Sequence, residues 1–322
     1  MNKAKLLVGI DISKDHFDAY SEELGHSKYS NDQKGYGEFY KQVKGKDVCC
    51  VMEATGTYHY RLANWLYTHG VGVSVVNALV IKRYMQMKLR INKTDKSDAR
   101  MIASYARDQD SPLWSPDPEY ISRTKELFSL LELYTRQSTM TKNKLHSLEM
   151  MGLKGGRVIA SLRRRIKATD KEMSMLGTAL EALIKEHDGA LYEGLKSIPG
   201  VGKKTAMMLI ASTNGFRNFE SSKQVSSYFG LAPNHRVSGS SIRGRSYISK
   251  RGNPMVRNHL FMCSFTACKH NPSCAALFER IVAQGKSKKL ALIAVANKLI
   301  KQAYAIAKTG VDFDPNYGGE LA

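Results

Sequence analysis

Residues 119–193 constrain the fold of this chain more than any other segment. These 75 residues contain no proline and are rich in Leu, Met, Lys and Glu. Apolar side chains recur at helical spacing in two stretches, at Leu127, Leu130, Leu131 and Tyr134 and again at Met173, Leu176, Leu180, Leu183 and Ile184. The spacing predicts two long helices that form a hairpin or a coiled coil. A coiled coil is typical of oligomers, although packing within one chain would produce the same pattern.

The segments on either side of these helices differ in character. Three prolines, Pro112, Pro116 and Pro118, precede the helices and mark a boundary. After residue 193 the pattern changes to short helices joined by glycine-rich turns. We therefore predict an α/β domain over residues 1–110, a helical coiled-coil linker over 111–193 and a mainly helical domain over 194–322.

The first 110 residues alternate between short apolar runs and helical patterns, which predicts an α/β fold. The predicted strands are Leu6–Ile12, Phe17–Tyr20, Val48–Met52 and Val71–Val76. The predicted helices are Thr57–His69, with Tyr60 and Tyr67 among its inward residues, and Thr94–Arg107, with Thr94 as its N-cap.

The charge of the chain indicates the class of its partner. It has 49 Lys and Arg against 29 Asp and Glu, a net charge of +20, which points to a polyanion. Residues 221–311 hold fifteen of the basic residues and a single carboxylate, Glu279, and so account for +14. A segment this poor in acid suits contact with phosphates, although a basic solvated face is the alternative.

Cysteine usage and hydropathy exclude several other classes. The five cysteines are an odd number without CxxC spacing, which argues against a disulfide framework or a zinc site. No run of 18 apolar residues is present, and residues 1–12 lack the cleavage site of a signal peptide. We expect a cytoplasmic, nucleoid-associated protein with reduced thiols and no membrane partner.

Four carboxylates of the first domain form a candidate metal site. Asp11 and Glu53 stand at the ends of predicted strands, and Asp95 and Asp98 lie three residues apart on one face of a predicted helix. Carboxylates that converge require a cation, and oxygen ligands suit Mg²⁺ in phosphodiester chemistry. Each acid alone also has a structural explanation, such as a helix-dipole contact or a turn cap.

Residues 198–206 predict a helix-hairpin-helix with a Gly-x-Gly turn. Gly200 and Gly202 would expose backbone N–H groups at the start of the second helix, and Lys203 and Lys204 would add charge for a DNA phosphate. A plain packing loop is the alternative. A nucleotide P-loop is excluded, because GxxxxGK(S/T) is absent.

Residues 235–257 surround a serine cluster with cations. Ser238, Ser240 and Ser241 are candidate nucleophiles, and Gly239 would let a DNA backbone approach. The basic residues of this segment, all candidates for binding nucleic acid and stabilising a phosphorane, are Arg236, Arg243, Arg245, Lys250, Arg251 and Arg257. A non-catalytic phosphate-binding turn would explain the composition equally well.

These motifs resemble, in order and over nearly the whole chain, the DEDD-type insertion-sequence transposases and related pilin-gene invertases of the insertion sequence 110 family. The matching segments are residues 9–14, 52–58, 92–100, 198–202, 230–233, 238–239 and 248–252. The resemblance implies a RuvC-like domain of ribonuclease-H type, a coiled coil and a C-terminal transposase domain.

The resemblance also implies roles for individual residues. The DEDD acids would be Asp11, Glu53, Asp95 and Asp98, binding Mg²⁺ or Mn²⁺, and the catalytic serine would be Ser238. The serine would form a covalent phosphoserine with the cleaved strand, assisted by the acids of another protomer. A structured noncoding bridge RNA would pair with target and donor DNA, and dimers would assemble into a tetramer.

The sequence therefore predicts a DNA recombinase, with four alternatives. These are a site-specific invertase without guide RNA, a junction-resolving nuclease that uses water, a sugar-kinase or actin-like ATPase with a similar Gly9-Ile10-Asp11 opening, and a non-catalytic nucleic-acid-binding module. The acid-poor C-terminal segment argues against the ATPase, and a binding module leaves the four acids without a role.

Overall fold

The computed structural model describes residues 6–54, 56–88, 95–234, 237–238, 242–243, 247–249 and 252–315, without the side chains of residues 95, 96, 234, 237, 238, 242 and 243. It divides the chain into two compact units, residues 1–117 and 118–322. Each unit has its own apolar core. The division between residues 117 and 118 falls a few residues after the predicted boundary at 110, at the last of the three prolines.

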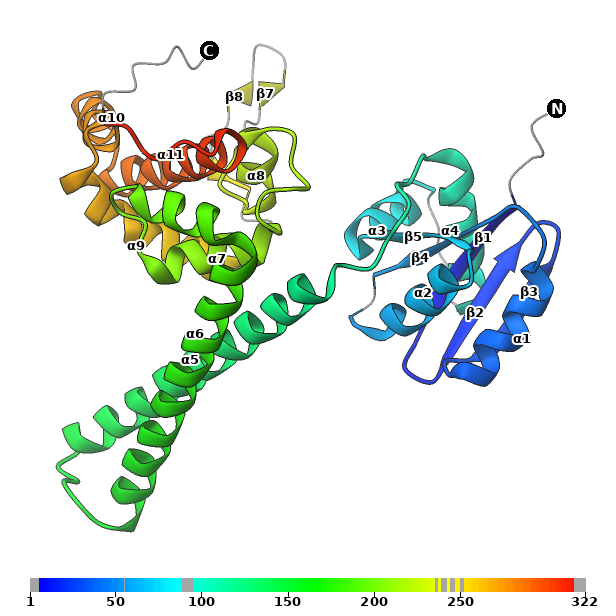
Figure 1. Ribbon diagram of the computed structural model, residues 1–322, viewed down its shortest axis with the longest axis horizontal. Coiled ribbons are helices and arrows are strands. Elements are labelled where there is room, and N and C mark those ends of the chain that lie inside the picture. Colours follow the sequence, from blue (N-terminus) through cyan, green and yellow to red (C-terminus); the bar gives the residue numbers. More distant parts are fainter. Residues whose placement is uncertain are drawn as a thin grey trace. The chain divides into compact units, whose positions relative to one another are not determined.

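The first unit is a mixed sheet with helices (Figure 1). Its elements are β1 (Leu6–Ile12), β2 (His16–Ser21), β3 (Gly25–Ser30), α1 (Gln33–Val43), β4 (Val48–Glu53), α2 (Tyr58–Thr68), β5 (Gly72–Val76), α3 (Ala78–Met87) and α4 (Asp95–Asp108). The strand order is β3-β2-β1-β4-β5, with β1, β2 and β3 antiparallel and β4 and β5 parallel to β1. The predicted α/β fold of this part is confirmed.

Strand alternation gives the sheet two different faces. The residues of β1 and β4 that point to one face join the core beneath α1 and α2; they are Val8, Ile10, Ile12, Val48, Cys50 and Met52. The intervening residues Leu7, Cys49 and Val51 belong to a second cluster with Ile81 of α3 and Ile102 of α4. Side chains two apart on a strand share a face, so the position of any residue of β1 or β4 follows from this pattern.

Helix α2 corrects one detail of the predicted core. Leu62, Ala63 and Leu66 are fully buried, but Tyr60 and Tyr67 are 42% and 45% exposed. Both rings pack edge-on against Trp114, whose backbone N–H donates to the carbonyl of Val73. The two tyrosines therefore hold the segment that leaves the unit instead of filling its core.

The second unit begins with the predicted pair of long helices, α5 (Glu119–Met150) and α6 (Arg157–Ser197). They pack along each other as an antiparallel hairpin that extends away from the C-terminal helices (Figure 1). A bond of 2.9 Å from the Ser138 hydroxyl to Asp170 joins their facing sides. Helix α6 is kinked at Asp188, and the predicted boundary at 194 falls inside this helix.

The remaining helices of the second unit form its core. They are α7 (Lys203–Thr213), α8 (Ser222–Tyr228), α9 (Pro254–His270), α10 (Pro272–Ala283) and α11 (Lys288–Thr309). Among the described residues between α8 and α9 are the two-residue strands β6 (Pro233–Asn234), β7 (Val237–Ser238), β8 (Ile242–Arg243) and β9 (Tyr247–Ile248). Cys49, Cys50 and Cys274 are buried, and Cys263 and Cys268 are half-buried.

Helix α11 has the length and apolar composition of a membrane span. Its apolar side is part of the core of the second unit, where Val295, Ala296, Leu299 and Ile300 have no exposed surface. A core helix of a folded domain has this composition, so α11 gives little support to a membrane span.

Candidate functional site

The sheet places two of the predicted acids side by side. Strands β1 and β4 are parallel, with Ile10 beside Met52, so that the next residues, Asp11 and Glu53, stand at the same level. Both lie at the carboxyl ends of their strands and are half-buried. By alternation they point to the face opposite the Val8–Ile10–Ile12 cluster, which is the face that α4 covers.

Gly9 allows α4 to approach that face. A Cβ atom at Gly9 would overlap the backbone of Ala99 and Ala103 in α4, so only glycine fits the present spacing. Asp98 immediately precedes Ala99 and is only 8% exposed. Asp95 lies one turn before Ala99 on the same helical face, although its side chain is outside the described residues. Helix α4 thus brings the third and fourth acids to the face that carries Asp11 and Glu53.

The sequence reasoning missed a further acid on this face. Asp18 of β2 is the register partner of Asp11 and is 6% exposed. Its carboxylate lies 2.7 Å from Nε2 of His26 and 3.9 Å from Nζ of Lys28, both on β3. Like charges directly opposite in a sheet repel, and these two partners offset that repulsion. Pairing the two predicted strands Leu6–Ile12 and Phe17–Tyr20 across their tight turn would have placed Asp18 opposite Asp11.

We call Asp11, Glu53, Asp95 and Asp98 the acid group and ask whether it fits Mg²⁺. The donors are all carboxylate oxygens, the ligand type that Mg²⁺ prefers. Within the described side chains, however, no three His, Cys, Asp or Glu residues gather closely enough to hold a metal ion. The acid group therefore fits in donor chemistry and in its place on the sheet, and metal binding stays a prediction.

The predicted helix-hairpin-helix consists of the end of α6, a turn over residues 198–202 and α7. Its two glycines serve different purposes. Gly200 has φ +105°, and a Cβ there would lie 2.8 Å from the Cβ of Ala267 in α9, so this glycine permits internal packing. Gly202 is the N-cap of α7, is exposed and has open space around it. Of the two, Gly202 is the one that a phosphate could approach.

The two lysines after Gly202 also differ. Lys203 forms an ion pair with Glu181 of α6. The hydrogen bond from Lys203, and to a smaller extent the one from Lys185, lowers the pKa of Glu181 to about 2. Lys204 is exposed, and its charge adds to burial in lowering the pKa of His259. Lys203 therefore ties the turn to α6, whereas the exposed Lys204 stays the predicted contact for a phosphate.

The candidate nucleophile lies on a short ribbon. Ser238 ends β7 and pairs with Ile242 of β8, while Val237 pairs with Arg243. In the chain this pair is nested within a second pair, β6 with β9, where Pro233 faces Ile248. We call these four strands the serine ribbon. The side chains of Ser238 and Arg243, and all of Arg236, Arg245, Lys250, Arg251, Gly239, Ser240 and Ser241, lie outside the described residues.

The base of the serine ribbon is tightly attached to α8. Gly252 has φ +96°, and a Cβ there would overlap the carbonyl oxygen of Tyr228. Arg257 donates from Nη1 to the carbonyls of Phe229, at 3.1 Å, and of Gly252, at 2.9 Å. These bonds give Arg257 a role in holding the ribbon, besides the predicted contact with nucleic acid.

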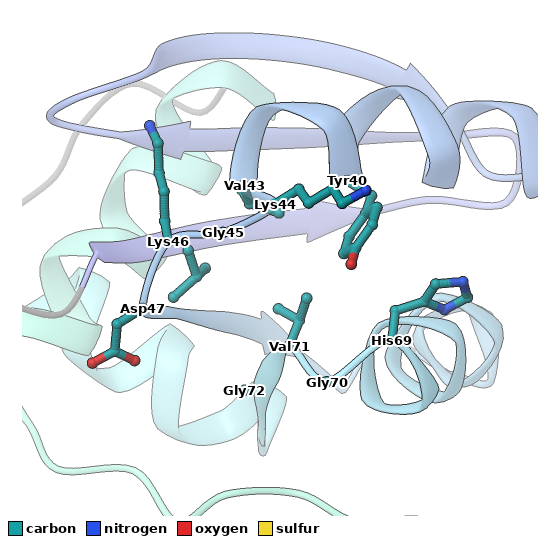
Figure 2. A pocket seen from close by; sticks show the side chains of 11 residues that line it. Tyr40, Val43, Lys44, Gly45, Lys46, Asp47, His69, Gly70, Val71 and Gly72 are labelled. Atoms are coloured by element: carbon teal, nitrogen blue, oxygen red, sulfur yellow. The ribbon is translucent and has the colours of Figure 1, made fainter.

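A hollow of the first unit lies away from the acids. It has a volume of about 170 Å³ and lies where β4 and β5 begin, at Val48 and Gly72. Figure 2 shows Tyr40 and His69 on one side of it and Lys46 and Asp47 on the other. Because Asp11 and Glu53 stand at the opposite, carboxyl ends of the strands, this hollow is not part of the acid group.

Known proteins resemble the chain over nearly its full length. A transposase model of DEDD type from IS110 elements matches residues 8–148, and the model of IS116/IS110/IS902 family transposases matches residues 192–279. The pilin gene-inverting protein of Moraxella bovis is 30% identical over 97% of this chain and 98% of its own length. The transposase for insertion sequence element IS1111A of Coxiella burnetii is 27% identical over 91% of this chain and 86% of its own length.

Proposed function

The chain belongs to the IS110 family of transposases, and on this premise we propose that it cuts and rejoins DNA strands through Ser238 with the help of the acid group. A DNA transposase or recombinase activity follows from its relatives. The serine nucleophile, the metal ion and the use of a guide RNA are our proposals. DNA as the substrate implies that the protein acts at the bacterial nucleoid in the cytoplasm.

One observation carries the proposal. Asp11 and Glu53 stand at one level of adjacent strands, and Gly9 lets α4 bring Asp98 against the same face. Three carboxylates on one face of a sheet offer the oxygen ligands that a divalent cation prefers. Mg²⁺ or Mn²⁺ held there would polarise the scissile phosphate and lower the pKa of the attacking hydroxyl.

The proposed step is a transesterification at phosphorus. The Oγ atom of Ser238 attacks the phosphodiester, the Oγ–P bond forms, and the P–O bond to the leaving deoxyribose oxygen breaks. A carboxylate of the acid group accepts the serine proton and passes it to the leaving deoxyribose oxygen. The hydroxyl of the incoming strand then attacks the phosphoserine: its O–P bond forms, the Oγ–P bond breaks, and its proton passes through the same carboxylate to Oγ of the released serine. Cations of the serine ribbon would stabilise the charge on the phosphorane.

Other features support the finer parts of the predicted architecture. The strand order β3-β2-β1-β4-β5, with three antiparallel strands first, is compatible with a RuvC-like, ribonuclease-H-type domain. The α5–α6 hairpin supports a coiled coil, and we propose dimers or tetramers as the working form. In such an assembly the acid group of one protomer would act on the serine of another.

Covalent capture of DNA tests the nucleophile. We expect Ser238→Ala to lose the phosphoserine adduct on a suicide DNA substrate that carries the element's ends, while DNA binding in gel shift is retained. Ser240→Ala and Ser241→Ala are the matched controls and should still form the adduct. An adduct that persists in Ser238→Ala would show that another residue attacks, and strand cleavage by the wild type without any adduct would favour the water-using nuclease.

Mixing two inactive variants tests the division of labour between protomers. Asp98→Asn and Ser238→Ala should each abolish strand cleavage in Mg²⁺. If acids and serine from different protomers combine, an equimolar mixture should regain a measurable fraction of wild-type cleavage, whereas Asp98→Asn mixed with Asp11→Asn should stay inactive. Undiminished cleavage by Asp98→Asn would make that acid structural.

A second candidate is a site-specific invertase without guide RNA. The observation in its favour is the 30% identity, over almost the full chain, to a pilin gene-inverting protein. Sequencing the RNA that copurifies with the protein separates the two. A single structured noncoding species would support guidance by a bridge RNA, and its absence would support direct reading of DNA.

A further inference from the structure

The positive charge of the chain is concentrated in a second place besides the C-terminal segment. Residues 140–167 contain eight Lys and Arg and one acid, Glu149, a net +7. With residues 221–311 set aside as well, the rest of the chain carries 26 basic and 27 acidic residues. The two segments therefore account for the whole net charge of the protein.

Residues 140–167, which we call the hairpin tip, form the end of the α5–α6 hairpin farthest from the C-terminal helices (Figure 1). All eight cations are exposed: Lys142, Lys144, Lys154, Arg157, Arg163, Arg164, Arg165 and Lys167. Lys142 pairs with Asp170 and Arg163 with Glu149. Within the described part of the chain the other six form no ion pair, so their charge is available to an outside partner.

The hairpin tip lies well apart from the DNA-binding turn predicted at α7. Glu181 of α6 contacts Lys203 at that turn, and Arg164 lies 17 residues earlier on the same helix. At 1.5 Å per residue the two points are about 25 Å apart along the helix. This is less than one turn of B-DNA, about 34 Å, so one duplex can reach both sites.

We propose that the hairpin tip is a second DNA-binding surface, which holds the phosphate backbone of duplex DNA beside the segment bound at the C-terminal helices. The proposal rests on the proposed function in taking DNA as the partner. Six exposed cations without carboxylate partners suit a row of phosphates. Tip-to-tip association of two copies is disfavoured because it would bring two surfaces of net +7 together.

The test compares two triple variants of equal charge change. Arg164→Gln/Arg165→Gln/Lys167→Gln alters the hairpin tip, and Lys34→Gln/Lys41→Gln/Lys44→Gln removes three exposed lysines of the first unit. Binding of a fluorescent 40-bp duplex of random sequence is measured by anisotropy at several salt concentrations. We expect the tip variant to bind at least tenfold more weakly than the control variant at 100 mM salt. The slope of log K against log salt should fall by up to about 2.7 for three lost phosphate contacts.

Three outcomes would overturn the proposal. They are equal DNA affinity of the two variants, a loss confined to a structured RNA of similar length, and a loss of self-association in sedimentation velocity with DNA binding intact. Unchanged far-UV circular dichroism and thermal midpoint show that the tip variant is folded. Adduct formation by Ser238 is scored separately, so that the serine mechanism can fail while the hairpin tip still binds DNA.

Discussion

The acid group and the serine ribbon, the two candidate sites of the chain, are built in different ways. Asp11 and Glu53 stand on a five-stranded sheet with apolar clusters on both faces, and α4, which carries Asp95 and Asp98, is fitted to this sheet through Gly9. Ser238 stands on a strand of two residues that pairs with another strand of two residues. Two apolar clusters position the acid group, whereas the contacts described for the serine ribbon lie at its base, at Gly252 and Arg257.

This difference separates two kinds of vulnerability. A substitution in the core of the first unit should reduce both stability and strand cleavage, because the residues that place the acids are also core residues. A fault at the base of the serine ribbon should disturb chemistry alone, because Gly252 and Arg257 hold the ribbon without forming the main core. Substitutions at the two sites can test this division.

Gly9→Ala should have the largest effect. The added methyl group would overlap the backbone of α4, so either the helix moves away or the sheet deforms. We expect a loss of about 3 kcal/mol in the free energy of unfolding, the upper range for overpacking a core, and at least a hundredfold loss of strand cleavage. Urea unfolding and cleavage of the element's ends measure the two effects.

Gly37→Ala is the matched control for this substitution. Gly37 lies in α1 of the same unit, and a Cβ there has nothing within 4 Å. The control should cleave DNA at the wild-type rate and unfold at the same or a higher urea concentration. Wild-type stability of Gly9→Ala with lost cleavage would break the proposed coupling between core and acids.

Gly252→Ala should have the next largest effect, and on chemistry alone. Its φ of +96° and the nearby Tyr228 carbonyl leave no room for a methyl group, so the base of the ribbon must shift. We expect adduct formation to fall ten- to a hundredfold while the unfolding of the first unit is unchanged. Gly177→Ala, in open space on α6, is the control. An adduct yield equal to that of this control would show that the ribbon does not depend on its base.

The sequence predicted the elements that have a local hydrophobic pattern. It missed the features that depend on contacts between segments distant in the chain. Strands β1, β4 and β5 carry continuous apolar runs and were predicted nearly to the residue. Strand β3 was missed because its residues, Gly25–Ser30, are polar and largely exposed at the sheet edge. Tyr60 and Tyr67 have helical spacing but face Trp114, which no local pattern shows.

The same distinction applies to the candidate site. Strand ends and helical spacing indicated Asp11, Glu53, Asp95 and Asp98, but Asp18 required the pairing of β1 with β2. Charge composition indicated Lys203 and Arg257, yet their partners, Glu181 and backbone carbonyls, depend on packing between distant segments. Residue type and spacing locate a site, whereas the partner of each charged group requires the fold.

Asp18→Ala should have an intermediate effect. Asp18 stands opposite Asp11 and lies 2.7 Å from Nε2 of His26, so its loss leaves His26 and Lys28 of β3 without this carboxylate. We expect about a tenfold loss of cleavage and a changed Mg²⁺ concentration for half-maximal rate. Asp18→Asn retains the side-chain volume and a hydrogen bond to His26, and it should recover most of the rate. Equal losses in both variants, with no change in the Mg²⁺ midpoint, would limit Asp18 to a structural role.

Glu181→Gln should have the smallest effect and tests whether the second unit carries its own electrostatic brace. The hydrogen bond from Lys203, and to a smaller extent the one from Lys185, lowers the pKa of Glu181 to about 2. A lowered pKa in the folded state stabilises the protein at pH values above the ordinary value of about 4.5, and this stabilisation disappears as the pH falls from 4.5 towards 2. We expect Glu181→Gln to cost about 1 kcal/mol in urea unfolding at pH 7, and this cost to shrink as the pH falls and to vanish below about pH 2.

The control for this change is Glu186→Gln, an exposed acid on the same helix, which should alter the free energy of unfolding by less than about 0.5 kcal/mol at either pH. Glu181→Gln also frees Lys203 for a phosphate. If Lys203 is only a brace, DNA affinity should be unchanged in this variant; if it also binds DNA, affinity should rise, because the competing carboxylate is gone. A cost of unfolding that persists undiminished at pH 2 would show that Glu181 acts through packing and not through its charge.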